Sequence, residues 1–166
     1  EIATLYPWAA TGRDMKRKNN IFTSLDLDQE RHERHNIHLQ QKYATIKEEE
    51  VRYEEIMTED AEYLVVAFGS AARIAQKAIE DCRSEGIKVG LLRPITLWPF
   101  PTKRVAELAG QVKGILCAEI NAGQMVQDIR LAVEGKTPVS HYGRMGGMVP
   151  TPEEIAEVIR KQLVQE

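Results

Sequence analysis

The chain has 166 residues, of which 43% are hydrophobic and 28% are charged, a composition that suits one core of ordinary size with an arm or linker. Its net charge of −3 provides no bulk basic field, so nucleic acid is not indicated as a partner. No apolar run reaches the about 18 residues that a membrane span requires, so a membrane partner is not indicated either.

The first sixty residues, 1–60, are predicted to form an interdomain linker and a helical arm. They are more acidic than the rest of the chain and contain no strand-like apolar run. Residues 28–50 favour a helix with Asp28 as its N-cap. Its apolar stripe is too narrow for a helix that stands alone, and consists of Leu39, Tyr43 and Ile46. We therefore expect this helix to lie against a larger surface.

Two polar clusters of the arm have both a functional and a structural interpretation. His32, His35 and His38 recur every three residues, but they turn gradually around the helix and no second ligand cluster matches them. We expect a solvated polar face there, not a metal site. The basic run 13–19 is short and lies among acidic residues. It suits a flexible loop, with or without a contact to another subunit, better than a phosphate site.

Residues 61–166 alternate short apolar runs with amphipathic stretches, which predicts one α/β domain. Strands are expected at 63–68, 87–92 and 114–120, with a weaker one at 138–143. The first helix is expected to begin with Ser70 as its N-cap and to end at Gly86. The second is expected to begin with Thr102 as its N-cap, and the third to end at Gly135.

The last helix has the clearest signals of the chain. Thr151 suits the N-cap, Pro152 the first helical position and Glu154 the far side of a capping box. The two cysteines, Cys82 on a helix face and Cys117 within a strand, lie in apolar patterns. We expect buried free thiols, which are typical of the reducing cytoplasm.

Strands that alternate with helices predict an α/β fold with a mainly parallel sheet and helices on both of its faces. Such domains place their functional groups at the carboxyl edge of the sheet. The expected interface or ligand site at this edge comprises Gly69, Ser70, Arg93, Trp98, Asn121, Gln124 and Arg144. No acid, base or nucleophile is held by a partner there, so no catalytic residue is predicted.

Two of these positions also have a simpler interpretation. The turn 68–73 leads into a helix N-terminus and could suit an anion, but it lacks the GxGxxG and Walker patterns, so we expect a plain strand–helix turn. Asn121 suits either recognition or a hydrogen bond that ties its own turn. His141 suits packing within a strand.

Five stretches together resemble the alpha subunit of 2-oxoacid:ferredoxin oxidoreductases, in the 2-ketoisovalerate and 2-oxoglutarate branch. They follow in the order HERHNIHLQQKYATIKEEEVRYEE, VAFGSAARIA, GIKVGLLRPITLWPFP, EINAGQMVQDIRLAVEGKTPV and YGRMGGMVPTPEEI, and they cover nearly the whole chain. Each stretch alone is weak evidence, but their order and spacing are specific. The resemblance implies a transketolase C-terminal-like domain, which is the last part of that subunit.

The resemblance also implies a set of cofactors and partners for the complete enzyme. In the family, a 2-oxoacid is oxidatively decarboxylated with thiamine diphosphate and Mg²⁺, electrons pass to an iron–sulfur cluster and ferredoxin, and the acyl group passes to coenzyme A. This chain has neither the GDG…N motif nor a cysteine cluster, so it is expected to bind none of these cofactors and to be inactive alone. Whether coenzyme A touches this domain is left open by the sequence. Its expected partners are the preceding domain of the same subunit and the other subunits.

The segment LLRPITLWPFP at 91–101 fits such an assembly. Prolines fix a protruding loop, Trp98 and Phe100 supply rigid apolar contact, and Arg93 suits a carboxylate or phosphate. The alternative is a loop that folds back onto its own core. A rival function is a free-standing module that binds a phosphorylated ligand at the carboxyl edge. The loop-like start without methionine instead indicates a piece of a longer protein.

Overall fold

The computed structural model describes residues 23–164, which fall into two compact units with a boundary between Gln41 and Lys42. The basic run 13–19 lies outside the described residues, so the prediction for it remains open. The second unit contains all the strands of the described chain.

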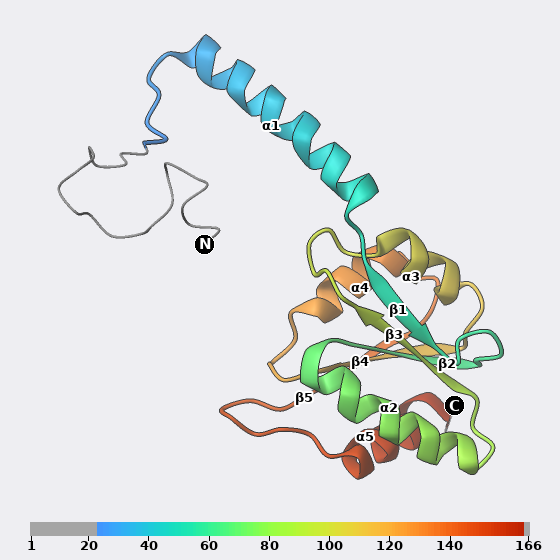
Figure 1. Cartoon of the computed structure of the whole chain (residues 1–166). Coiled ribbons are helices and arrows are strands. Elements are labelled where there is room, and N and C mark those ends of the chain that lie inside the picture. The colour runs from blue at the N-terminus through green and yellow to red at the C-terminus, as the bar shows by residue number, and fades with distance from the viewer. Residues whose placement is uncertain (1–22, 165–166) are drawn as a thin grey trace, which may run out of the picture. The chain divides into compact units, whose positions relative to one another are not determined.

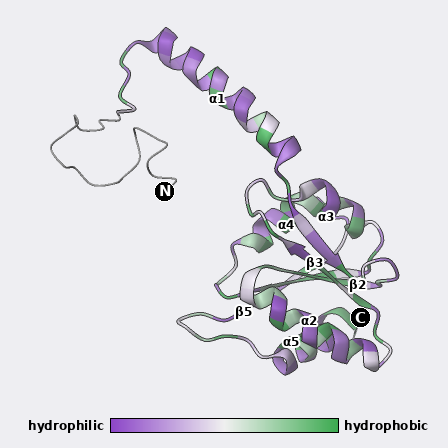
Figure 2. Cartoon of the chain, in the orientation of Figure 1, coloured by the Kyte–Doolittle hydropathy of each residue, from purple (hydrophilic) through white to green (hydrophobic). Residues whose placement is uncertain are grey.

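Helix α1 (Gln29–Glu49) begins in the first unit and is hydrophilic along most of its length (Figure 2). Asp28 caps it by accepting a hydrogen bond from the backbone N–H of Arg31 at 2.9 Å, which confirms the predicted N-cap. No residue of the helix is buried. The three histidines, His32, His35 and His38, are exposed, as expected for a solvated polar face.

Five strands form one sheet in the order β1-β3-β2-β4-β5 (Figure 1). Their bounds are β1 Tyr53–Ile56, β2 Tyr63–Ala67, β3 Val89–Pro94, β4 Gly114–Glu119 and β5 Val139–Gly143. The pairs β2–β3, β2–β4 and β4–β5 are parallel, whereas β1 pairs antiparallel with β3. The predicted mainly parallel sheet is therefore confirmed.

Helices cover both faces of this sheet, as predicted (Figure 1). Their bounds are α2 Gly69–Ser84, α3 Thr102–Ala109, α4 Met125–Val133 and α5 Pro152–Ile159, the last followed by a π-helical turn at Arg160–Val164. Val65 and Ala67 of β2 pack with α2 and α5, while Leu64 and Val66 pack with α3 and α4. This alternation along one strand is why a continuous apolar run builds two cores.

The predicted helix ends are confirmed at some positions and wrong at others. Thr151 and Glu154 form the expected capping box at the start of α5. Ser70 and Thr102 are not N-caps, because each lies inside the first turn of its helix. The chain turns earlier than predicted, so that Phe68 and Pro101 occupy the cap positions without a side-chain hydrogen bond.

The expectation that no strand precedes Tyr63 is wrong, because β1 lies within the segment assigned to the arm. Its sequence, YEEI, has two charged residues, and only Ile56 packs against the core. A short, charged strand is typical of a sheet edge, where one side has no neighbour. The predicted boundary after residue 60 thus cuts through a sheet, and the unit that contains this sheet begins at Lys42.

Two truncated chains test how far the domain extends. A chain of residues 42–166 keeps every strand and is expected to unfold cooperatively in urea. A chain of residues 61–166 loses β1 and the contact of Ile56 with the core, so its free energy of unfolding should be lower by about 2 kcal/mol. Circular dichroism measures both transitions. Equal stability of the two chains would show that β1 contributes nothing to the fold.

Candidate functional site

The carboxyl ends of β3, β2, β4 and β5 lie side by side along one edge of the sheet, because these strands are parallel neighbours (Figure 1). The predicted site residues follow these strand ends in the chain. Gly69 and Ser70 lie in the turn after β2. The structure places the other five predicted residues in two groups. Asn121, Gln124 and Arg144 lie at the β4 and β5 end, and Arg93 and Trp98 lie at and beyond the end of β3.

The loops after β4 and β5 touch each other. The backbone N–H of Arg144 donates to the carbonyl oxygen of Glu119 at 3.3 Å. A Cβ atom at Gly143 would collide with the carbonyl oxygen of Asn121, so only glycine permits this approach. The two loops therefore form one continuous surface at the carboxyl edge.

Beneath this surface lies the carboxylate of Glu119, which is fully buried. It accepts hydrogen bonds from the backbone N–H groups of residues 124–126, at 3.3, 2.9 and 3.1 Å. It also accepts from Asn121 Nδ2 at 2.9 Å and from Cys117 Sγ at 3.2 Å. Glu119 thus caps the N-terminus of α4 from the preceding strand, since no local side chain caps that helix.

The electrostatics of this cluster favour a stable carboxylate and an inert thiol. Burial raises the pKa of Glu119, but the hydrogen bonds from Asn121, Met125, Cys117 and Val126 outweigh it, and the pKa lies below its ordinary value. Burial and the nearby charge of Glu119 raise the pKa of Cys117 far above that of a free thiol. Cys117 therefore donates a hydrogen bond and is not a nucleophile.

Asn121 ties its own turn, as one of its two interpretations predicted. Its Oδ1 accepts from the backbone N–H of Gly123 at 2.7 Å, while its Nδ2 donates to Glu119. Gln124 uses its backbone N–H in the same way and leaves its side chain exposed. The Nε2 atom of His141 lies 3.5 Å from Glu119 Oε1 and is buried without a hydrogen bond to the described residues.

Both guanidinium groups of the predicted site have partners within the chain. Arg93 Nη1 lies 2.7 Å from Glu54 Oε2 of β1, and Arg144 Nη1 lies 2.6 Å from Glu154 Oε1 of α5. The pKa of Glu154 is lowered by the backbone N–H of Thr151 and by Arg144. The sequence predicts that Arg93 suits a carboxylate or a phosphate, and its partner is a carboxylate of the same chain.

Gly69 and Ser70 form the first turn of α2 and are exposed. This turn has no acidic residue and no capping side chain, so its backbone N–H groups suit an anion. The phosphate-binding alternative thus rests on a helix N-terminus alone.

The segment between β3 and α3, residues 95–101 and called the proline loop below, combines both of its predicted interpretations. Phe100 packs against the core, as a loop that folds back would. Trp98 remains 55% exposed and contacts the edge of Tyr43 in α1, with 5.6 Å between the ring centroids and an interplanar angle of 85°. Hydrogen bonds from Ile95 and Thr96 to Arg52 hold the loop beside β1.

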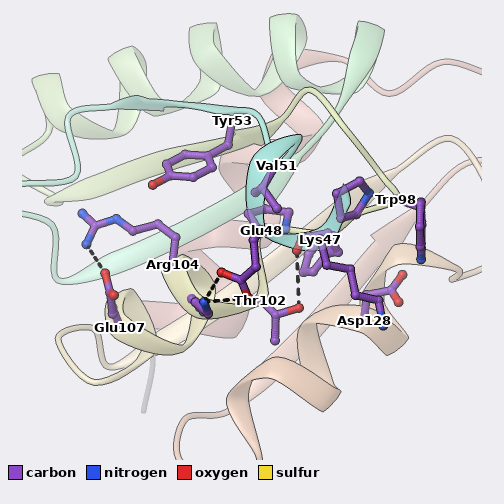
Figure 3. Close-up of a pocket in the computed structure, with 13 residues that line it drawn as sticks. Lys47, Glu48, Val51, Tyr53, Trp98, Thr102, Arg104, Glu107 and Asp128 are labelled. Carbon is purple, nitrogen blue, oxygen red and sulfur yellow. Dashed lines mark hydrogen bonds and ion pairs between the residues drawn. The ribbon is translucent and has the colours of Figure 1, made fainter. Parts of the chain in front are cut away.

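A groove of about 670 Å³ opens between the proline loop, the end of α1 and the start of α3 (Figure 3). Trp98 and Tyr53 supply aromatic surface to it. Its charged residues include Lys103, paired with Glu48 at 2.9 Å, and Arg104, which is paired with Glu55 and Glu107. Local sequence patterns do not indicate this groove, because its walls come from segments far apart in the chain.

Besides the groove, the predicted site also omits Glu119. Its signal in the sequence is a carboxylate that ends an otherwise apolar strand, 114–118. A charge at such a position needs several donors, and the backbone N–H groups of the following helix supply them. Glu119 is therefore the residue that a search for buried charge at strand ends would have found.

The described residues contain no group of three or more His, Cys, Asp or Glu side chains that fits a metal ion. Cys82 and Cys117 are both buried and free, as predicted, but they belong to the cores on opposite faces of the sheet. Their placement does not suit shared ligation of a cluster. Among helices of residues 23–164, none is long and apolar enough to cross a membrane.

Residues 61–155 match the family model described as pyruvate:ferredoxin oxidoreductase core domain II. Ketoisovalerate oxidoreductase subunit VorB of Methanothermobacter thermautotrophicus is 46% identical over 154 residues, which are 93% of this chain and 43% of that protein. 2-Oxoglutarate synthase subunit KorA of Methanothermobacter marburgensis is 32% identical over 102 residues, or 61% of this chain and 27% of that protein. The chain spans less than half the length of these relatives.

Two solved structures have a similar fold. A 2-oxoglutarate:ferredoxin oxidoreductase from Magnetococcus marinus, with 2-oxoglutarate, coenzyme A and succinyl-CoA bound, aligns with a TM-score of 0.72 and 24% identity over 83% of this chain and 24% of that chain. A split-gene transketolase, an inactive beta4 tetramer, aligns with a TM-score of 0.58 and 18% identity over 68% of this chain and 41% of that chain. These likenesses support the observed α/β fold.

Replacing the buried carboxylate tests its part in the fold. Glu119→Gln keeps the size of the side chain but turns an amide N–H₂ toward N–H donors, so the free energy of unfolding at pH 7 should fall by about 3 kcal/mol. Glu80→Gln, on the exposed surface of α2, is the matched control and should change it by less than about 0.5 kcal/mol. Urea unfolding followed by circular dichroism measures both values.

The same variants test the pH dependence of Glu119. Its pKa in the folded protein lies below the ordinary 4.5, so its stabilising effect is present above pH 4.5 and is lost as the pH falls through the folded value. The difference in unfolding free energy between wild type and Glu119→Gln should therefore shrink below about pH 4.5. A difference that stays constant down to acid unfolding would contradict the ionised state of Glu119.

Proposed function

Because this chain belongs to the family of pyruvate:ferredoxin oxidoreductase core domain II, we propose that it is the C-terminal structural and assembly domain of the alpha subunit of a 2-oxoacid:ferredoxin oxidoreductase. The observation that carries this proposal is the 46% identity to VorB along 93% of the chain. The lower identity to KorA favours 2-ketoisovalerate over 2-oxoglutarate as the substrate of the complete enzyme.

In the complete enzyme, thiamine diphosphate with Mg²⁺ supplies the chemistry of decarboxylation, an iron–sulfur cluster carries electrons to ferredoxin, and coenzyme A accepts the acyl group. The donor set of the described residues does not fit the metal or the cluster, since the two thiols face different cores and no carboxylate cluster accompanies them. We therefore assign no catalytic step to this chain. Its buried free thiols support a place in the reducing cytoplasm.

The proposed task of the chain is to present fixed surfaces to the rest of the complex, namely the preceding domain of the same subunit and the other subunits. Five hydrogen-bond donors to Glu119 tie the loop after β4 to the strand and to the first turn of α4. The backbone that carries the exposed side chain of Gln124 is therefore held in one position. Rigid loops lose little conformational entropy on association, which favours binding. On this basis Gln124 is the proposed contact residue of this loop. The other six residues of the predicted edge stay a prediction, since Arg93, Asn121 and Arg144 already have partners within the chain.

The proposal predicts that the pure chain does not turn over 2-oxoacids. With thiamine diphosphate, Mg²⁺, coenzyme A, 2-ketoisovalerate and a viologen dye, the chain alone should reduce no dye above the rate without substrate. The complete complex that contains this chain should reduce it. Sustained, substrate-dependent reduction by the chain alone would overturn the proposal.

Gln124 permits a comparison of assembly with turnover. Gln124→Ala in the complete complex should weaken subunit association roughly threefold to tenfold, the range expected for one hydrogen bond, and leave turnover per assembled complex unchanged. Gln127→Ala, on the exposed side of α4, is the matched control and should change neither quantity. Analytical ultracentrifugation and dye reduction on the same samples measure both. Intact assembly with lost turnover would place this edge in the chemistry instead.

A further inference from the structure

Exposed apolar side chains lie on the segments that form the groove beside Trp98. Ile95 and Leu97 in the proline loop are 51% and 46% exposed, and Tyr53 across the groove is 38% exposed. The hydrogen bond from Ile95 N to Arg52 O, at 2.9 Å, holds these two segments together. A monomeric protein seldom exposes large apolar side chains in one contiguous patch unless another surface covers them.

The ionic groups that line this groove are of two kinds. Lys103 and Arg104 already have carboxylate partners within the chain. Lys47 and Asp128 also line the groove, and neither forms an ion pair within residues 23–164 (Figure 3). Both are exposed, so their charges remain available at the rim. The groove therefore offers an apolar centre beside Trp98 and a charge of each sign that has no ion-pair partner among the described residues.

We infer that this groove binds an extended segment of another polypeptide of the same complex, with an apolar side chain beside Trp98, an acidic side chain facing Lys47 and a basic one facing Asp128. This inference rests on the proposed function, because that function supplies a complex. It adds a second contact surface, formed by the proline loop and the end of α1, to the loops after β4 and β5.

The chemistry of the lining favours a polypeptide over a small ligand. A small-ligand site has a few buried polar groups that converge on the ligand, but the two buried unpartnered side-chain atoms of the described residues, Arg93 Nε and His141 Nε2, belong to residues outside the groove lining. Trp, Tyr and Arg around an apolar centre, with charges at the rim, are instead typical of protein interfaces. The edge contact with Tyr43 also holds the indole of Trp98 in place before any partner arrives.

Site-specific photo-cross-linking in the purified complete complex identifies the occupant directly. The cross-linker p-benzoylphenylalanine replaces Thr102, which lines the groove, or Val164, which is 37% exposed in the turn after α5 and outside the groove. From position 102, mass spectrometry should recover one segment of another polypeptide that carries an apolar residue between charged ones. From position 164 it should recover no such segment. Cross-links from 102 only to this chain, or the same products from both positions, would overturn the inference.

Two substitutions then test the chemistry of the contact. Trp98→Ala and Lys47→Glu should each weaken association of the complex at least about tenfold, and only the effect of Lys47→Glu should diminish in high salt. Val164→Ala and Lys136→Glu, outside the groove, are the matched controls and should change association by less than about twofold. Thermal unfolding of each isolated variant chain separates a folding defect from a contact defect.

The possible outcomes distinguish this inference from the proposed function. A wild-type complex that fails to assemble or to oxidise 2-oxoacids contradicts the proposed function itself. A wild-type complex that assembles and turns over, but tolerates both Trp98→Ala and Lys47→Glu, contradicts only the groove as a docking site. A small molecule retained by the wild type in native mass spectrometry and lost in Trp98→Ala would also overturn the inference.

Discussion

The buried carboxylate of Glu119 is the interaction on which the carboxyl edge of this domain depends. An unpaired charge in a protein interior is strongly destabilising, so its presence requires donors on every side. The structure supplies them from the strand, the turn and the first turn of α4. One side chain thereby fixes where β4 ends, where α4 begins and how the loop between them is shaped. The loop after β5 then packs on this fixed loop through Arg144 and Gly143.

At the edge of the sheet formed by β1, ion pairs rather than a buried charge hold the strand in place. Successive residues of β1 point to opposite faces, so Glu54 meets Arg93 of β3 while Glu55 meets Arg104 of α3. The hydrogen bonds from Arg104 lower the pKa of Glu55, although partial burial opposes them. Exposed ion pairs contribute little one by one, but a two-sided pair fixes the register of a strand that has few apolar residues.

The sequence predicts those parts of the fold whose signals are local. Apolar runs, the capping box at Thr151 and the helix-ending glycines all act within a few residues, and they identify four strands and the last helix. Local patterns do not reveal β1, because its stabilising partner, Arg93, lies about forty residues away and leaves no periodic signal in YEEI. They do not reveal the groove for the same reason, since Glu48 and Lys103 meet only after folding. Pairing at long range is the information that local patterns lack.

The same distinction explains why the sequence predicts an edge of the sheet but not the partners of its residues. Strand ends indicate the edge, but only the folded chain shows that Arg93 and Arg144 are already paired and that Asn121 ties its own turn. What remains available to a partner is the exposed Gln124 at one end of the edge and the apolar surface around Trp98 at the other. In this domain most polar groups of the edge bind to other groups of the same chain, and the Cys117 thiol donates a hydrogen bond to a carboxylate. Such a domain is suited to holding neighbouring domains in place. Under the proposed function, the chemistry belongs to the neighbouring domains, and the rigidity of these two surfaces determines how well those domains are aligned.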